Sequence, residues 1–146
     1  MSGGNTVAAD GSEVDVGGLS GMTDEASFSG CRILVVEDEY YLAADAARVL
    51  REAGAEILGP CSSEEAARME LEEQRPRAAV VDINLGLGPS FAFAETLKDL
   101  GIPFVFITGY DREAIPPEFV GIERLEKPVL LSDLVAAVAR LLGRNT

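Results

Sequence analysis

Charged and hydroxyl side chains follow the ends of several apolar runs in this sequence. Glu37 and Asp38 come directly after RILVV, and Asp82 comes directly after AAVV. Thr108 follows FVFI, and Lys127 follows the segment IERLE. Placing carboxylates at the tips of apolar segments is unfavourable unless a partner compensates their charge. The spacing therefore suggests that these side chains meet and act together.

These residue types are the ones that a phosphoryl-transfer centre needs. Converging carboxylates repel one another, and a divalent cation such as Mg²⁺ removes that repulsion while keeping several waters and phosphate oxygens as ligands. A carboxylate can also attack phosphorus and form an acyl phosphate. Lysine offers a compact positive charge, and a threonine hydroxyl can donate to a phosphoryl oxygen. We therefore expect a metal site, a nucleophile, a hydroxyl and an ammonium group at one centre.

Each of these signals also has an ordinary structural explanation. An acidic pair after a strand often belongs to a solvated loop, and a lone aspartate at a strand end often caps a helix. A Thr-Gly pair usually marks a turn, and a lysine before proline usually lies on the surface. The functional interpretation therefore depends on the joint placement of the residues at four strand ends.

The elements that must position these side chains alternate between strands and helices from Cys31 onward. Predicted strands cover residues 31–36, 55–58, 77–81, 103–107 and 122–125. Predicted helices cover 41–53, from Ser62 or Ser63 to 74, 90–100, and 131–142 with Ser132 as its cap. This order, with short connections, implies a parallel sheet covered by helices on both faces and joined by right-handed crossovers. Ligands of such sheets bind at the carboxyl ends of the strands.

One unit of the alternation is weak. Pro116 and Pro117 interrupt the segment between the last two predicted strands. Residues that precede a proline are pushed away from helical backbone angles. We therefore expect a fourth helix that is short or irregular.

Composition and charge exclude several classes of site. The chain has 25 acidic and 12 basic residues, a formal net charge of −13, and no histidine. This charge argues against nucleic acid and anionic membranes as partners, and no apolar run approaches the roughly 18 residues that a membrane span requires. The absence of histidine excludes histidine-based zinc sites and Ser-His-Asp triads. With no signal-peptide pattern, a cytoplasmic location is expected.

The chain has 146 residues, which suggests one folded domain. Residues 1–30 are rich in glycine and serine and carry acidic but no basic residues, so we predict a disordered acidic tail there and a folded domain over residues 31–144. Cys31 and Cys61 would lie at opposite ends of neighbouring parallel strands. We therefore expect no disulfide.

Four blocks of the sequence, RILVVEDE, VVDINL, FITGY and LEKP, resemble the signature blocks of bacterial response-regulator receiver domains. Their order and spacing match that family over residues 31–144. The resemblance implies the flavodoxin-like (βα)5 fold, an α/β fold with a five-stranded parallel sheet in the order 2-1-3-4-5.

The resemblance also assigns roles to residues. It implies that Asp82 is the phosphoacceptor and that Thr108 and Lys127 contact the phosphoryl group. It further implies a Mg²⁺ site formed by Glu37, Asp38, Asp82 and the backbone carbonyl of Asn84. The peptide bond before Pro128 is typically cis in this family.

The sequence departs from the usual family pattern near the fifth strand. Arg124 stands where the family normally carries a switch tyrosine or phenylalanine. Tyr110 lies two residues after Thr108, and FITGY resembles the Phe-x-Thr-Gly-Tyr motif of a receiver subfamily found with HWE-type histidine kinases. Tyr110 is therefore a switch candidate that could take over the missing aromatic role. The alternative is that Tyr110 packs permanently against neighbouring loops.

The resemblance implies a stand-alone response regulator of two-component phosphorelay signalling, since no room for an output domain follows the last predicted helix. Asp82 would accept a phosphoryl group from a sensor histidine kinase and so switch protein–protein interactions with a downstream target. The protein would take part in its own phosphorylation and dephosphorylation and would not be a turnover enzyme on an external substrate.

Three other functions use or imitate the same residues. A phosphotransfer intermediate or phosphate sink would exchange the group with a histidine phosphotransfer protein and need no conformational output. A pseudo-receiver would bind partners without phosphorylation, but the intact Asp82, Thr108 and Lys127 argue against it. A haloacid-dehalogenase-type phosphatase expects a second aspartate where Asn84 stands, and a cap domain that this length does not accommodate.

Overall fold

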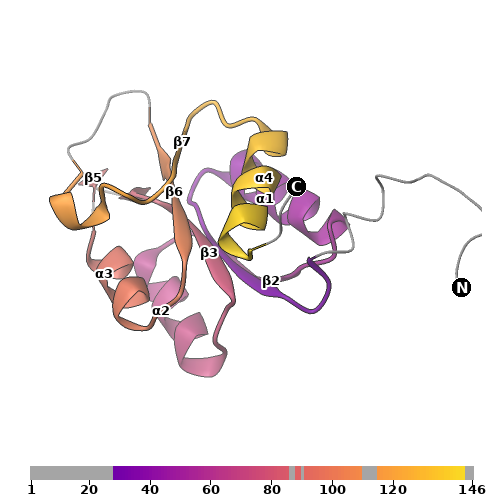
Figure 1. Ribbon diagram of the computed structural model, residues 1–146, viewed down its shortest axis with the longest axis horizontal. Helices are drawn as coiled ribbons and strands as arrows, with labels where there is room; N and C mark the ends of the chain where they lie inside the picture. The colour runs from indigo at the N-terminus through magenta and orange to yellow at the C-terminus, as the bar shows by residue number, and fades with distance from the viewer. Residues whose placement is uncertain (1–27, 86–87, 90, 110–114, 144–146) are drawn as a thin grey trace, which may run out of the picture.

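The computed structural model describes residues 28–85, 88–89, 91–109 and 115–143. Its strands form a central sheet with helices on both faces (Figure 1). In chain order the elements are β1 (Arg32–Val36), α1 (Tyr40–Glu52), β2 (Glu56–Cys61), α2 (Glu64–Glu73), β3 (Ala78–Asp82), β4 (Asn84–Leu85), β5 (Gly88–Pro89), α3 (Ala92–Asp99), β6 (Phe104–Thr108), the 3₁₀ turn η2 (Pro117–Phe119), β7 (Arg124–Glu126) and α4 (Leu131–Leu141).

The central sheet has five strands in the order β2-β1-β3-β6-β7, and each neighbouring pair is parallel. With β6 and β7 as the fourth and fifth strands of this sheet, the order is the predicted 2-1-3-4-5. The predicted flavodoxin-like fold is therefore confirmed. The antiparallel hairpin of β4 and β5 after β3 was not predicted, because two-residue strands leave no periodic pattern in a sequence.

Hydrophobic side chains fill a separate core on each face of the sheet. Helices α1 and α4 cover one face of the sheet, and α2 and α3 cover the other (Figure 1). Ile33 and Val35 pack in the core beside α1 and α4, whereas Leu34 and Val36 pack in the core beside α2 and α3. Successive side chains of a strand alternate between the two faces. A strand covered on both faces therefore reads as a continuous apolar run, and this is the pattern of β1, β3 and β6 in the sequence.

Helix α2 begins as the sequence predicted, but α4 does not. The Ser63 hydroxyl accepts a hydrogen bond from the backbone N–H of Ala66 at 3.1 Å, so Ser63 caps α2. The prediction that Ser132 caps the last helix is wrong, because Leu130 occupies the cap position and makes no side-chain cap bond. A serine near a helix start is a weak indicator when a neighbouring residue can adopt the extended cap backbone.

Among the described residues of the segment with the two prolines, Pro116 precedes a short 3₁₀ turn, η2, that begins at Pro117. This confirms the prediction of a short or irregular fourth helix. The side chain of Phe119 in η2 is 1 % exposed and contacts the rings of Phe106, Phe91 and Phe104, with centroid distances of 5.8, 5.8 and 6.2 Å. Aromatic packing therefore anchors an element that has little regular backbone structure of its own.

The described part of the chain begins at Phe28, three residues before the predicted folded domain. Phe28 is buried, and its backbone N–H donates to the carbonyl of Ala53 at 3.3 Å, so it belongs to the core beside α1. Cys31 and Cys61 are both buried and form no disulfide, as predicted. Among the described residues, no helix combines the length and the apolar character that crossing a bilayer would require.

Candidate functional site

The residues that the sequence singled out gather at one edge of the sheet. Glu37 and Asp38 follow β1, Asp82 ends β3 and Thr108 ends β6, while Lys127 follows β7. Because these strands are parallel and adjacent, their carboxyl ends lie at the same edge. The fold therefore brings four separate parts of the chain to one place.

Three carboxylates form the centre of this site. Glu37, Asp38 and Asp82 each offer one oxygen, and these oxygens lie within 4.8 Å of one another. Glu37 and Asp82 are each 1 % exposed, whereas Asp38 is exposed at the mouth of the site. Like charges this close repel strongly when they are removed from water.

A divalent cation fits this donor set. Among the buried side-chain polar atoms described, Glu37 Oε1 has no hydrogen-bond partner. An unsatisfied buried carboxylate oxygen is expensive, and a metal ion is one of the few groups that compensates it. Oxygen ligands with one exposed carboxylate suit Mg²⁺, which prefers to retain several waters.

Lys127 lies among the carboxylates. Its ammonium Nζ is 3.0 Å from Asp82 Oδ2, 3.3 Å from Glu39 Oε1 and 3.5 Å from Glu37 Oε2. Burial acts to lower the pKa of Lys127, but the hydrogen bond and attraction of Asp82, together with Glu37 and Glu39, outweigh it and raise the pKa. Lys127 is therefore held in its charged form beside Asp82.

Among the carboxyls of this cluster, that of Glu37 has a raised pKa, because its ionised form is disfavoured. Burial, followed in smaller measure by the neighbouring Asp82, raises the pKa of Glu37 to about 8. The backbone N–H of Glu39, which donates to Glu37 Oε2 at 2.9 Å, and the charge of Lys127 both act in the opposite direction. A bound cation would favour the ionised carboxylate in the same way.

Both oxygens of Asp82 have partners in this structure. Asp82 Oδ1 accepts a hydrogen bond from the backbone N–H of Asn84 at 2.7 Å, and Oδ2 accepts one from Lys127. These contacts fix the carboxylate orientation. The side-chain amide of Asn84 also lies near Gly109, since a Cβ built on Gly109 would be 3.8 Å from Asn84 Nδ2. A larger side chain at Gly109 would therefore project toward this part of the site.

Thr108 is buried at the end of β6, and its carbonyl accepts the backbone N–H of Lys127 at 2.9 Å. This backbone bond couples the position of Lys127 to the tip of β6. The peptide bond between Lys127 and Pro128 is cis, as predicted. Arg124 is exposed on β7 opposite Phe106. The switch candidate Tyr110 lies outside the described residues.

Sequence reasoning missed Glu39. Its carboxylate is the second nearest partner of the Lys127 ammonium, and its backbone N–H donates to Glu37. The signal was present as a third consecutive acid in the run Glu37-Asp38-Glu39. A third acid in such a run is usually assigned to a solvated helix start, and more than half of the Glu39 side chain is in fact exposed.

The site and fold have relatives among known proteins. No protein-family model matches the chain. The phyllosphere-induced regulator PhyR of Methylorubrum extorquens is 30 % identical over 128 residues, which cover 82 % of this chain and 46 % of that protein. The transcriptional regulatory protein PrrA of Mycobacterium bovis is 34 % identical over 121 residues, 78 % of this chain and 51 % of that protein. The chain thus spans about half the length of these curated relatives.

Solved structures of similar fold include a response regulator receiver protein from Sinorhizobium medicae. It has a TM-score of 0.63 and 26 % sequence identity, and the match covers 79 % of this chain and 97 % of that chain. The similarity therefore extends over almost all of a solved receiver protein.

Proposed function

The chain belongs to the receiver domains of response regulators, and from this premise we propose that Asp82 accepts a phosphoryl group from a sensor histidine kinase. The observation that carries the proposal is the position of Asp82, buried within 4.8 Å of two further carboxylate oxygens and 3.0 Å from the Lys127 ammonium. A buried carboxylate held between a cation site and a lysine is suited to attack a phosphoryl group.

In the proposed reaction, a carboxylate oxygen of Asp82 attacks the phosphorus of a phosphohistidine. A bond forms between phosphorus and this oxygen, and the bond between phosphorus and the imidazole nitrogen breaks. The electron pair of that bond leaves with the imidazole of the donor. Lys127 shifts its hydrogen bond from Asp82 to a phosphoryl oxygen and offsets the added negative charge.

Glu37, Asp38, Asp82 and the backbone carbonyl of Asn84 would hold Mg²⁺. When bound, Mg²⁺ neutralises negative charge on the carboxylates and on the incoming phosphoryl group. Glu37 would offer an oxygen to the ion from the buried side of this site, and Asp38 would offer one from the exposed side. Thr108 donates its hydroxyl to the phosphoryl group from the tip of β6.

The acyl phosphate would change the shape of this edge of the sheet. It adds negative charge and acceptor oxygens beside Lys127 and Thr108, whose backbones are already joined by a hydrogen bond. Drawing both groups toward the phosphoryl oxygens moves the start of the connection between β6 and η2. We assign this change the role of switching protein–protein interactions in a cytoplasmic phosphorelay, with an HWE-type kinase as the partner that FITGY favours.

Mass spectrometry after incubation with phosphoramidate and Mg²⁺ tests the proposal. The parent protein should gain the mass of one phosphoryl group, and Asp82→Asn should gain none because its amide is not a nucleophile. Asp45→Asn, which changes an exposed aspartate of α1, is the matched control and should be labelled like the parent. Equal labelling of the parent and Asp82→Asn, or no labelling of the parent, would refute the assignment.

A further inference from the structure

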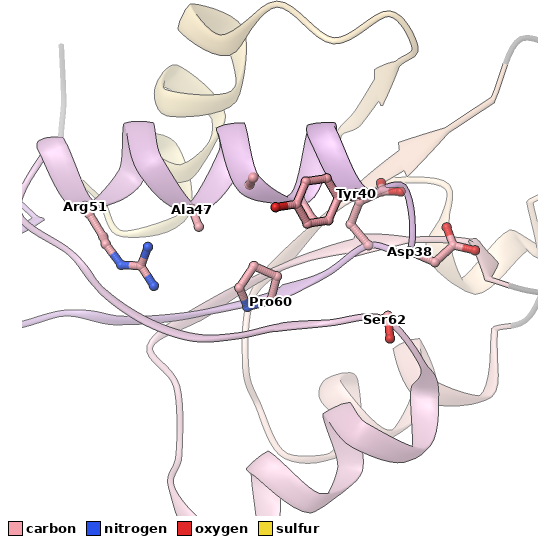
Figure 2. Close-up of a pocket in the computed structure, with 9 residues that line it drawn as sticks. Asp38, Tyr40, Ala47, Arg51, Pro60 and Ser62 are labelled. Carbon is pink, nitrogen blue, oxygen red and sulfur yellow. The ribbon is translucent and has the colours of Figure 1, made fainter.

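A groove lies beside the carboxylate site, between helix α1 and the end of β2, and is here called the α1 groove. Its volume is about 380 Å³. Figure 2 shows Tyr40 and Asp38 at one end, Arg51 at the other, and Ala47 and Pro60 facing each other between them. Small-molecule sites in proteins are concave, mostly apolar, and have volumes of roughly 300–1,000 Å³. The α1 groove has the size and shape of such a site.

Small side chains keep the α1 groove open. Ala43, Ala44 and Ala47 line it from the helix, and Pro60 lines it from β2. The three alanines lie on one face of α1, because residues three and four apart are neighbours on a helix. A leucine or phenylalanine at any of them would occupy much of the space. The middle of the α1 groove is therefore an apolar channel.

The two ends of the α1 groove differ in charge. Glu37 and Asp38 line the end next to the carboxylate site, together with the hydroxyl-bearing Ser62. At the other end Arg51 extends from α1 toward Pro60 (Figure 2). In the part of the chain that the structure describes, the Arg51 guanidinium has no ion pair. Arg48, one turn earlier, is instead paired with Asp45 and Glu52 at 3.4 and 3.5 Å.

Tyr40 gives the α1 groove an aromatic wall. Its side chain is 75 % exposed, and in Figure 2 the ring lies along the underside of α1 with its hydroxyl directed toward Ala47. An exposed aromatic ring offers a large apolar face at small conformational cost. A flat or narrow apolar group lying in the channel could therefore pack between the Tyr40 ring and Pro60.

We infer that the α1 groove binds a small organic acid whose apolar body lies along the three alanines and whose carboxylate pairs with Arg51. Charge complementarity selects this occupant, because Arg51 is the cationic end of a channel whose opposite end is lined by carboxylates. A planar guanidinium also matches a carboxylate in a bidentate arrangement. The anionic end of the ligand is directed away from Glu37 and Asp38.

Binding at the α1 groove would communicate with the phosphorylation site. Glu37 and Asp38 belong to both, and Tyr40 follows them after a single residue. A ligand that orders Tyr40 also restrains the segment between β1 and α1. Any change that the ligand makes in Mg²⁺ affinity must be matched by an equal change that Mg²⁺ makes in ligand affinity.

Two-dimensional ¹H–¹⁵N NMR of the full chain tests the inference, with phenylbutanoate as the probe. Saturable shifts are expected at the amides of Ala43, Ala47 and Arg51, with a Kd on the order of 1 mM for a ligand of this size. Neutral phenylbutanamide has the same apolar body and should bind about tenfold more weakly because it cannot pair with Arg51. Absence of saturable shifts, or equal binding of acid and amide, would overturn the inference.

Three variants localise the binding. Arg51→Gln should weaken phenylbutanoate binding about tenfold, whereas Arg48→Gln, which removes a similar charge from the same helix, should leave it unchanged. Ala44→Leu adds bulk at an exposed position of the channel and should abolish binding without disturbing the core. Equal weakening by both arginine variants, or unaltered binding to Ala44→Leu, would place the ligand elsewhere. The same titration on Asp82→Asn separates this site from the proposed function, because binding does not require phosphorylation.

Discussion

At the scale of single residues, Lys127 is the most heavily contacted cation of the site. Its ammonium group has three hydrogens and three carboxylate neighbours, those of Asp82, Glu39 and Glu37. A phosphoryl group on Asp82, as proposed above, would have to compete for this ammonium. Because Glu39 is the most exposed of the three acids, it both holds Lys127 toward the mouth of the site and adds negative charge there.

Glu39→Gln should therefore speed labelling by anionic phosphoramidate. We expect a rate increase of about two- to threefold at low ionic strength, in the range of exposed ion pairs. The increase should shrink as salt rises, because a Debye length of about 8 Å at physiological ionic strength screens a charge at the mouth. The measurement is the initial rate of mass labelling across a salt series. Glu52→Gln, an exposed glutamate at the far end of α1, is the control.

A rate for Glu39→Gln that matches the parent at every salt concentration would show that Glu39 has no electrostatic role. A salt-independent increase would instead indicate a change in local structure. The sequence could predict the acids at the ends of buried strands, because a charged residue directly after a long apolar run is easily recognised in the sequence. It could not predict Glu39, since only the three-dimensional distance to Lys127 distinguishes it from an ordinary helix-start acid.

At the scale of elements, η2 is held in place by the packing of one side chain rather than by a regular helix. The turn comprises only Pro117–Phe119, yet Phe119 is buried among three other phenylalanine rings. The ammonium of Lys98 also lies over the Phe119 ring at 5.7 Å from its centroid. One side chain therefore fixes the end of the connection that begins at Thr108 and Gly109.

Phe119→Ala should lower the free energy of unfolding by about 3–5 kcal/mol, the usual range for truncating a buried phenylalanine to alanine. Val120→Ala is the matched control, because Val120 is adjacent and 79 % exposed. It should change the free energy of unfolding by less than about 0.5 kcal/mol. Urea denaturation followed by circular dichroism measures both values. Similar effects of the two substitutions would mean that the ring cluster does not anchor η2.

The elements differ in how far the sequence could predict them. The prolines before Phe119 indicated an irregular fourth element, because each restricts the preceding backbone. The hairpin of β4 and β5 was not foreseen, since it depends on tertiary placement rather than on periodicity. Ser63 and Ser132 illustrate the same limit at helix starts, because Ser63 caps α2 through its hydroxyl whereas Leu130, not Ser132, occupies the cap position of α4.

At the scale of the whole molecule, the β-then-α repetition predicted a parallel sheet with helices on both faces, and the resemblance to receiver domains supplied the strand order. That order alone brings Glu37, Asp82 and Lys127 to one edge from distant parts of the chain. The α1 groove was not predictable. Its openness depends on the alanines of α1 lying opposite Pro60, and no local pattern specifies that pairing.

The carboxylate cluster should also couple Mg²⁺ to global stability. Only the folded chain brings Glu37, Asp38 and Asp82 within reach of one ion, so Mg²⁺ should raise the free energy of unfolding by about 2.7 kcal/mol at a hundred times its Kd. Urea denaturation with and without Mg²⁺ measures this increment. Asp38→Asn should lose most of it, while Asp45→Asn should retain it. An unchanged midpoint for the parent would argue against a metal site here.

The carboxylates and Lys127 all lie at one end of the sheet. The opposite end is therefore available for attaching a tether or a label. The turn that joins α3 to β6 lies at that opposite end, and Asp99 beside it is exposed. A tether or a fluorescent reporter attached at this turn would hold the protein by its distal end. Single-molecule or surface-based recordings of encounters with the proposed kinase could then be made with the carboxylate edge facing the solution.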